Sequence, residues 1–427
     1  MLYTSDIDVL VLSLNLLLRP SQQYSTQLAL SHALSISTPR LLSLADKWPY
    51  TRENAVSFVD LVSPDGDLKV RSLPAEARKV HFNFYRTESP ASATDKKVEP
   101  DVFDATTPSR KPHASQTGQV NIALDEQTLH SKPMMHVLAD AIEKHSVPES
   151  EKFELLCRTR AALALSGSTD DREKLVIVRL LAIAIFGHTH PEAQAATSLF
   201  LYEPDLIPHI AELLQVDRNV PVSVQTAAIA ALDALARYRG KIQEVLTAVN
   251  AGVNHGILMA LFRKTVSDIA DPESTLPHAF IEALLSFVTF IASHASGGNM
   301  VVGAGLIPLL IQIIENKSST RISALSKTMQ LVDNVLYSFA SAFQVFCNSR
   351  GVEVLVERIE VSRLASLTFD YLYYPCSTKS ILTLKATRPG LQTVSYLFLL
   401  RFPVLTFCRR TAHFAIFCLK ARFQINA

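Results

Sequence analysis

The hydrophobic pattern of this chain is helical over most of its length, and it is clearest at AGLIPLLIQIIE, residues 304–315. Gly305 can adopt the turn conformation that a Cβ disfavours, and Pro308 falls in the first turn, where its missing N–H costs nothing. The pattern predicts an amphipathic helix that begins after a glycine turn. Large apolar residues recur at i, i+3, i+4, i+7 and i+8 on its buried face: Leu306, Leu309, Leu310, Ile313 and Ile314.

Similar units recur elsewhere in the sequence. They follow Asp205 (PDLIPHIAELL), Gly252 (AGVNHGILMALF) and Gly351 (RGVEVLVERIE), at steps of about 47, 53 and 46 residues. The repetition predicts a helical solenoid of the armadillo or HEAT type, with residues 304–315 as the third helix of a repeat. Four unrelated amphipathic helices are the alternative. Longer helical patterns follow the first three units, over residues 223–238, 279–294 and 327–346.

Three helices are also predicted at the start of the chain, over residues 6–19, 21–34 and 38–48. The first is apolar nearly all round, so we expect it to be fully packed and to end at Pro20. Its apolar run follows Asp6 and Asp8, where a secretory signal would carry Lys or Arg. We interpret it as a core helix, and a signal anchor is the alternative.

Two short stretches then change to β character, over residues 55–62 and 79–85. Val80, Phe82 and Phe84 alternate with polar residues, which is the pattern of a half-buried strand. We predict a short β-hairpin near residues 55–85 in an otherwise all-α protein.

Composition divides the chain into four parts. Residues 1–86 are a first helical region that includes the hairpin. Residues 87–120 are rich in Ser, Thr, Pro, Lys and Asp and predict a disordered linker, because they cannot bury enough apolar surface to offset the entropy of ordering. Residues 121–361 are the repeat domain, and residues 362–427 form a tail of different character. Further helices are predicted in the repeat domain over residues 134–145, 153–165 and 172–186.

The tail is basic and aromatic, and it lacks a helical period. From residue 363 it holds one acid, Asp370, against nine Lys and Arg residues. Its apolar run, residues 391–408, has about the minimum length of a membrane span, but Arg401 lies in the middle, where a charge is costly. We expect no membrane span and a poorly ordered tail. Our hypothesis is that the tail derives from a read-through intron or a shifted frame.

Charge and cysteine content bear on the class of protein. The formal net charge of +1 gives no reason to expect a nucleic-acid partner. Five cysteines, an odd number without a CxxC pair, are typical of reduced thiols in an intracellular protein. We therefore expect a location in the cytoplasm, the nucleus or both.

The sequence carries no strong catalytic or metal-binding motif. His188 and His190 could share a metal only from a strand or an irregular loop, so we expect a loop between helices there. Dinucleotide, P-loop, zincin and hydrolase-elbow patterns are absent from the sequence. Cys157 and Cys347 fall within helical stripes as small buried residues, and Cys376 lies in the tail. We predict no catalytic residue, no metal and no cofactor.

Several long stretches nevertheless resemble one family. They are LNLLLRPSQQYS (14–25), LADKW (44–48), VHFNFY (80–85), the run from Glu151 through LLAIAIFGH to EPDLIPHIAELL, and DNVLYSFASAFQVFCNSRGVEVLVERIEV (333–361). They are similar to the N-terminal region of the giant HECT-type E3 ubiquitin ligases, the Huwe or Mule family with its fungal and plant relatives. The resemblance covers most of residues 1–361.

The resemblance implies an armadillo-like fold and a place in the ubiquitination pathway. In that family the HECT module, with its thioester-forming cysteine, lies at the far C-terminus. No such module or cysteine context occurs in this sequence, so no catalytic residue is carried over from the family. A start at Met1 on a predicted buried helix adds to the expectation of a ligase fragment.

Three functions follow from these observations. The first is a non-catalytic arm of a ligase, whose solenoid surface holds substrates or braces the rest of the enzyme. The second is a free-standing armadillo adaptor, although such adaptors read peptides with a tryptophan and asparagine ladder and the one tryptophan here, Trp48, lies outside the repeats. The third, an enzyme in its own right, lacks its motifs. Exposed residues of the repeats are the candidates for protein binding: Arg237, Tyr238, Arg263 and Lys264.

Overall fold

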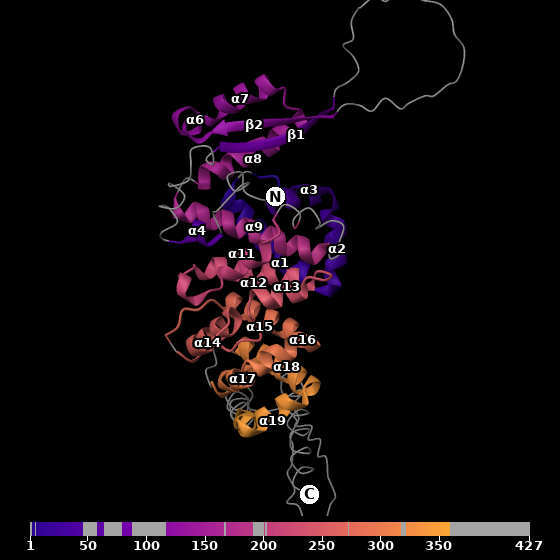
Figure 1. Cartoon of the computed structure of the whole chain (residues 1–427), viewed down its shortest axis with the longest axis vertical. Coiled ribbons are helices and arrows are strands. Elements are labelled where there is room, and N and C mark those ends of the chain that lie inside the picture. The colour runs from indigo at the N-terminus through magenta and orange to yellow at the C-terminus, as the bar shows by residue number, and fades with distance from the viewer. Residues whose placement is uncertain are drawn as a thin grey trace, which may run out of the picture. The chain divides into compact units, whose positions relative to one another are not determined.

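The computed structural model of this chain is helical, with one small sheet among the residues that it describes (Figure 1). The prediction of an all-α helical solenoid with a short β element is confirmed. The chain divides into two compact units: unit 1 is residues 1–190 with 194–204, and unit 2 is residues 205–427 with 191–193. The structure describes residues 2–4, 6–45, 58–63, 79–87, 117–165, 168–190, 200, 203–271, 273–316 and 322–358. The tail prediction and most of the linker prediction therefore lie outside the described residues.

Unit 1 is built around α9 (Thr169–Thr189), which is buried along nearly its whole length. Ser168 caps its start by accepting a hydrogen bond at Oγ from the backbone N–H of Asp171, at 3.2 Å. The run Leu180–Phe186 is apolar on all sides, as expected for a helix with neighbours all round. Helices α1 (Ile7–Gln22), α2 (Tyr24–Leu34), α3 (Thr38–Ala45) and α4 (Phe58–Val62) pack on it.

Two predictions about α1 are wrong. The helix does not end at Pro20 but continues to Gln22, because a proline in the last turn removes one hydrogen bond rather than a run of them. Nor is it fully packed. Leu10 and Leu14 are buried, whereas Leu12 and Leu16 on the opposite side are each 63% exposed.

The sheet pairs β1 (Lys79–Thr87) with β2 (Thr117–Asp125), antiparallel, with Lys79 opposite Asp125 and Thr87 opposite Thr117. The predicted strand over residues 79–85 is confirmed, but its partner is β2 and not residues 55–62, since α4 occupies residues 58–62. The reason lies in the apolar periods. Phe58, Val59, Leu61 and Val62 follow a helical spacing, whereas β2 alternates and so shares an apolar face with β1: Val80, Phe82 and Phe84 with Val120, Ile122 and Leu124.

Three helices complete unit 1: α6 (Glu126–Ser131), α7 (Met134–His145) and α8 (Glu149–Leu165). Helix α8 contacts β1, and α6 and α7 contact β2, so the sheet is covered by this local group. Strand β2 begins at Thr117, inside the stretch that was predicted to be linker.

Unit 2 is a succession of helices that pack mostly on neighbours in sequence and on helices three positions further along. They are α11 (Leu206–Glu212), α12 (Val222–Arg237), α13 (Ile242–Ala248), α14 (Ile257–Ala270), α15 (His278–Ser293), α16 (Ala295–Gly303), α17 (Leu306–Glu315), α18 (Ile322–Ser338) and α19 (Ala340–Asn348). Contacts of α12 with α15 and of α15 with α18 stack the long helices in a row (Figure 1). Such nearest-neighbour stacking is the architecture of a solenoid.

Helix α17 confirms the prediction made for residues 304–315. Gly305 has φ 95°, in the left-handed region that favours glycine, and the five residues of the apolar stripe are all buried. Around it the helices run short, middle and long, as in α16, α17 and α18, and the place of α17 as the third helix of a repeat stays a prediction.

Two other details of unit 2 differ from prediction. After Gly252 the helix begins at Ile257, with Gly256 as its N-cap residue. A Cβ at Gly256 would lie 2.2 Å from the carbonyl oxygen of Asn250, so this turn requires glycine. Val253 lies in the turn and is exposed. The long helix predicted over residues 327–346 breaks at Phe339 into α18 and α19.

Among the described residues, no single helix has both the length and the apolar composition to cross a membrane. Helices α15 and α16 reach that length only as a pair bent by 115°.

Candidate protein-binding surface

The long helices α12, α15 and α18 carry a set of polar and aromatic side chains on one side. On α15 this side holds Glu282, Ser286, Phe290 and Ser293, which recur about every four residues and so share a helix face. The opposite side of α15 is the core side, where Leu284, Leu285, Val288 and Ile291 are buried. We call the polar side, with the side chains of α12 and α18 that meet it, the long-helix face.

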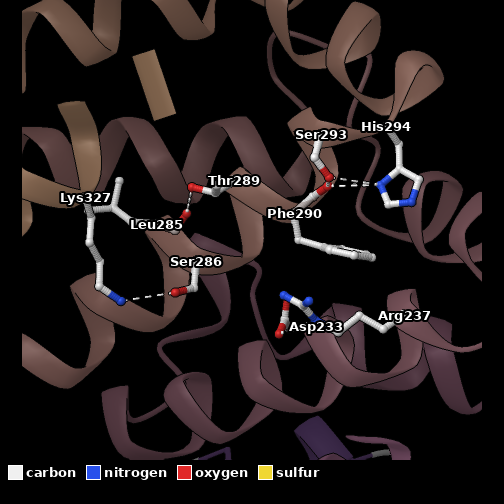
Figure 2. Close-up of polar contacts among 9 residues, drawn as sticks. All are labelled: Asp233, Arg237, Leu285, Ser286, Thr289, Phe290, Ser293, His294 and Lys327. Carbon is white, nitrogen blue, oxygen red and sulfur yellow. Dashed lines mark hydrogen bonds and ion pairs between the residues drawn. The ribbon is translucent and has the colours of Figure 1, made fainter. Parts of the chain in front are cut away.

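Arg237 is held in a fixed orientation at the end of α12 (Figure 2). Its Nε donates to Oδ2 of Asp233 and its Nη2 donates to Oδ1, both at 3.0 Å. Its guanidinium carbon lies 4.1 Å from the centre of the Phe290 ring on α15. The Asp233 side chain is only 6% exposed and that of Arg237 is 39% exposed. A buried carboxylate therefore holds the guanidinium in place while part of it stays accessible to solvent.

The Phe290 ring also meets His294, at 4.7 Å between ring centres and an angle of 65°. His294 Nδ1 lies 3.1 Å from the carbonyl oxygen of Phe290 and 3.3 Å from Oγ of Ser293. Phe290 thus lies between a guanidinium and an imidazole, both within reach of a partner (Figure 2).

Helix α18 joins the other flank of α15. Lys327 Nζ donates to Oγ of Ser286 at 3.1 Å, and Ser323 Oγ donates to Oε1 of Glu282 at 2.9 Å. The two bonds lie one helical turn apart on both helices. Together with the contact of Arg237 with Phe290, they link side chains of three successive long helices. Further along α18, Tyr337 is 88% exposed.

The predicted binding residues do not all lie together. Arg237 is on the long-helix face. Arg263 and Lys264 lie on α14, outside the row of long helices, and Arg263 Nη2 donates to the carbonyl oxygen of Asn254 at 3.2 Å. Tyr238 is 4% exposed, so its predicted exposure is wrong. The helical pattern ends at Arg237, and the extended backbone of Tyr238 turns its ring into the core. A protein-binding role for the other three stays a prediction.

Sequence reasoning missed Phe290, His294, Ser286 and Lys327. In the sequence, each is an ordinary polar or aromatic position on an amphipathic helix. The contacts that bring them together join residues at different separations along the chain: Arg237 and Phe290 are 53 positions apart, whereas Ser286 and Lys327 are 41 apart. Loops of different length therefore conceal the register of the surface.

His188 and His190 do not lie in the loop between helices that was predicted there, and residues 191–192 lie outside the described residues. His188 and Thr189 form the last turn of α9 and His190 caps it. The His190 ring stacks on Phe186 at 5.0 Å, and burial lowers the pKa of His190 below its ordinary value. Within the described ranges, no three His, Cys, Asp or Glu side chains gather where they could hold a metal ion.

The two described cysteines lie at partly buried positions, Cys157 on α8 and Cys347 on α19. Burial raises the pKa of the Cys157 thiol, with Arg40 acting in the opposite direction. A raised pKa leaves less thiolate at neutral pH and works against a nucleophilic role.

Comparison with known proteins gives the chain its family. The model described as Domain of Unknown Function (DUF908) matches residues 1–267. The chain is 29% identical over 244 residues to the E3 ubiquitin-protein ligase UPL2 of Arabidopsis thaliana, which covers 57% of this chain and 7% of that protein. It is 24% identical over 369 residues to the E3 ubiquitin-protein ligase HUWE1 of Mus musculus, which covers 84% of this chain and 8% of that protein.

The fission yeast ligase ptr1 of Schizosaccharomyces pombe gives a similar match, 26% identical over 239 residues, or 55% of this chain and 7% of the relative. This chain therefore spans at most about a tenth of the length of the curated relatives that it matches. The resemblance to giant HECT-type E3 ubiquitin ligases is confirmed. The chain belongs to the DUF908 family and is similar to E3 ubiquitin-protein ligases of a plant, a yeast and a mammal.

Proposed function

We propose that this chain is a non-catalytic part of an E3 ubiquitin ligase of armadillo-like build, and that it binds proteins through the long-helix face. The observation that carries the proposal is the arrangement of α12, α15 and α18, which places Arg237 on Phe290 beside His294, and Lys327 on Ser286 one turn of α15 away from Phe290. Arginine and aromatic residues dominate the energy of protein interfaces, and a side chain already held in place loses little entropy on binding.

The partners fall into two groups, substrates of the ligase and other parts of the same enzyme. The printed activity of the relatives supports both, since a ligase must hold its substrate while ubiquitin is transferred. Five cysteines, an odd number without a CxxC pair in the sequence, support an intracellular setting, in the cytoplasm, the nucleus or both.

Partner capture from cells tests the surface. The full chain is compared with the double variant Arg237→Ala, Lys327→Ala by quantitative mass spectrometry of bound proteins. We expect a defined subset of partners to fall about tenfold or more, because each truncation at an interface anchor costs 1 kcal/mol or more. The matched control is Arg239→Ala, an exposed arginine beyond the end of α12. Equal losses in the variant and the control would contradict the proposal.

A thioester assay tests the non-catalytic part. The full chain is incubated with E1, E2 and ubiquitin, and reducible adducts are sought on a non-reducing gel. We expect none, since burial raises the pKa of the Cys157 thiol and the sequence contains no HECT cysteine context. A reducible ubiquitin adduct on this chain would overturn this part of the proposal.

A further inference from the structure

A second surface, on unit 1, is independent of the proposed function. Helices α1 and α2 form a hairpin. The chain reverses at Gln23, where Thr26 Oγ1 donates to the carbonyl oxygen of Pro20 at 2.7 Å, and the Tyr3 hydroxyl donates to the carbonyl oxygen of Ile36 at 3.4 Å across the open end. More than half of the exposed large apolar side chains in the described residues lie on this hairpin or on the residues that flank its open end: Tyr3, Val9, Leu12, Leu16, Tyr24, Leu28 and Ile36.

These side chains follow one side of each helix. On α1, Val9, Leu12 and Leu16 recur at i, i+3 and i+7, opposite the side that Leu10 and Leu14 bury. On α2, Tyr24 and Leu28 recur at i and i+4 and are 94% and 71% exposed. We call this surface the hairpin face. Its scale is that of an interaction site rather than of scattered surface residues.

The hairpin face is held rigidly from behind. Lys174 Nζ on α9 lies 2.9 Å from Oδ1 of Asp8 and 2.7 Å from Oδ2 of Asp170, which fixes the start of α1. Arg40 Nε donates to the carbonyl oxygen of Leu2 at 3.0 Å, and this arginine is buried. The face is therefore preformed, and a partner would pay little to order it.

Sparse and balanced charge selects the partner. Residues 20–39 contain no Asp, Glu, Lys or Arg, and on α1 the exposed charges lie at opposite ends, Asp6 and Asp8 at its start and Arg19 in its last turn. A membrane surface would call for a cationic rim, and a charged partner would have to desolvate its charges without compensation. Such a face fits a copy of itself, because a twofold contact with the two α1 helices antiparallel sets the acidic start of one helix toward Arg19 of the other and keeps like charges apart.

We propose that the hairpin face pairs with the hairpin face of a second copy of this chain, as a twofold dimer. The exposed area of its apolar side chains is on the order of 800 Å², about what one partner contributes to a standard interface. Two helices from each copy form the contact, and the symmetry closes it at two chains.

Light scattering after size exclusion tests the dimer with the full chain over a wide range of concentration. We expect a mass of twice 47.1 kDa at high concentration. The variant Leu12→Gln, Leu16→Gln should raise the dissociation constant by about 100-fold or more, since each change acts twice in a symmetric contact. Both side chains are exposed and glutamine is a good helix former, so helicity by circular dichroism should stay the same.

The matched control is Met135→Gln, an exposed apolar residue of α7 outside the hairpin face, which should leave the dimer intact. If the α1 variant loses helicity, Tyr24→Gln, Leu28→Gln on α2 tests the same face. Three results would overturn the proposal: a mass of 47.1 kDa at every concentration, a dimer that neither pair of substitutions weakens, or growth beyond two chains.

Discussion

Arg237 concentrates several weak interactions at one residue. Its ion pair with Asp233 is within one helix, where such pairs contribute a few tenths of a kcal/mol, and its stacking on Phe290 adds about 0.5–1 kcal/mol. Lysine would keep the charge but lose both the forked geometry and the planar stacking. The value of Arg237 therefore lies in its shape as much as in its charge.

We expect Arg237→Lys to lower the free energy of unfolding by about 1 kcal/mol. Urea denaturation followed by circular dichroism measures the change. Arg239→Lys is the control, because Arg239 is exposed beyond the end of α12 and should shift the midpoint little. Equal effects of the two substitutions would show that the contact with Phe290 contributes nothing measurable.

His190 makes the stability of unit 1 depend on pH. Burial against Phe186 lowers the pKa of His190 in the folded chain below its value of about 6.5 in the unfolded chain. The unfolded chain therefore binds more protons as the pH falls through this range, so the contribution of His190 is complete above about pH 6.5 and is lost below it.

The variant His190→Gln should accordingly lose less stability than the parent chain between neutral and mildly acidic pH. Urea midpoints at the two pH values measure the difference, and the other histidines act as a common background in both proteins. An unchanged pH dependence in the variant would rule out His190 as a contributor.

Residue types alone predicted part of the candidate surface. Arg237 was found because an arginine at the end of an amphipathic helix is usually exposed. The prediction that Tyr238 is exposed was wrong because α12 ends at Arg237, and the extended backbone of the next residue turns the Tyr238 side chain into the core. Phe290 and Lys327 were out of reach, since their importance comes from neighbours 53 and 41 positions away.

At the scale of elements, the break between α18 and α19 shows how packing overrides pattern. The sequence favours one long helix, but Phe339 takes an extended backbone, with φ −130° and ψ 105°, and its ring lies against Gly298 of α16. A Cβ at Gly298 would stand 2.1 Å from Cζ of Phe339 and 2.8 Å from the carbonyl oxygen of Ala292. Only a glycine leaves room for this ring.

We expect Gly298→Ala to destabilise unit 2 by roughly 1–3 kcal/mol, the usual cost of overpacking a core. Gly303→Ala, in the same helix, has no atom within 4 Å of the added Cβ and should be neutral or slightly stabilising through helix propensity. Thermal and urea denaturation of the two variants measure the contrast. Similar effects at both positions would contradict the packing account of the break.

Elements with a strong period were predicted well. Helix α7 spans residues 134–145 as expected, and α12 and α15 each begin one residue before their predicted start. The sheet was the hardest element, because its two strands are separated by residues 88–116 and no local turn signal links them. Pairing across such a distance is decided by matching apolar faces, which a scan along the chain does not compare.

At the scale of the whole molecule, each unit presents its own kind of surface. On unit 1, exposed apolar side chains gather on α1 and α2, and unit 2 carries the polar and aromatic long-helix face. A solenoid exposes much surface for its mass, which suits a chain whose relatives are ligases many times its length. The role proposed for this chain is therefore to bind other proteins and not to catalyse a reaction.

Site-specific photo-crosslinking in cells tests that claim most directly. A photoreactive amino acid replaces Ser293 or Gln330, exposed residues on α15 and α18, or Ser267, an exposed residue on α14. We predict defined crosslinks to other proteins from Ser293 and Gln330, and their loss when Arg237→Ala and Lys327→Ala are introduced into the same chain. Crosslinks from Ser267 alone, or crosslinks from Ser293 and Gln330 that persist in the double variant, would contradict a protein-binding role of the long-helix face.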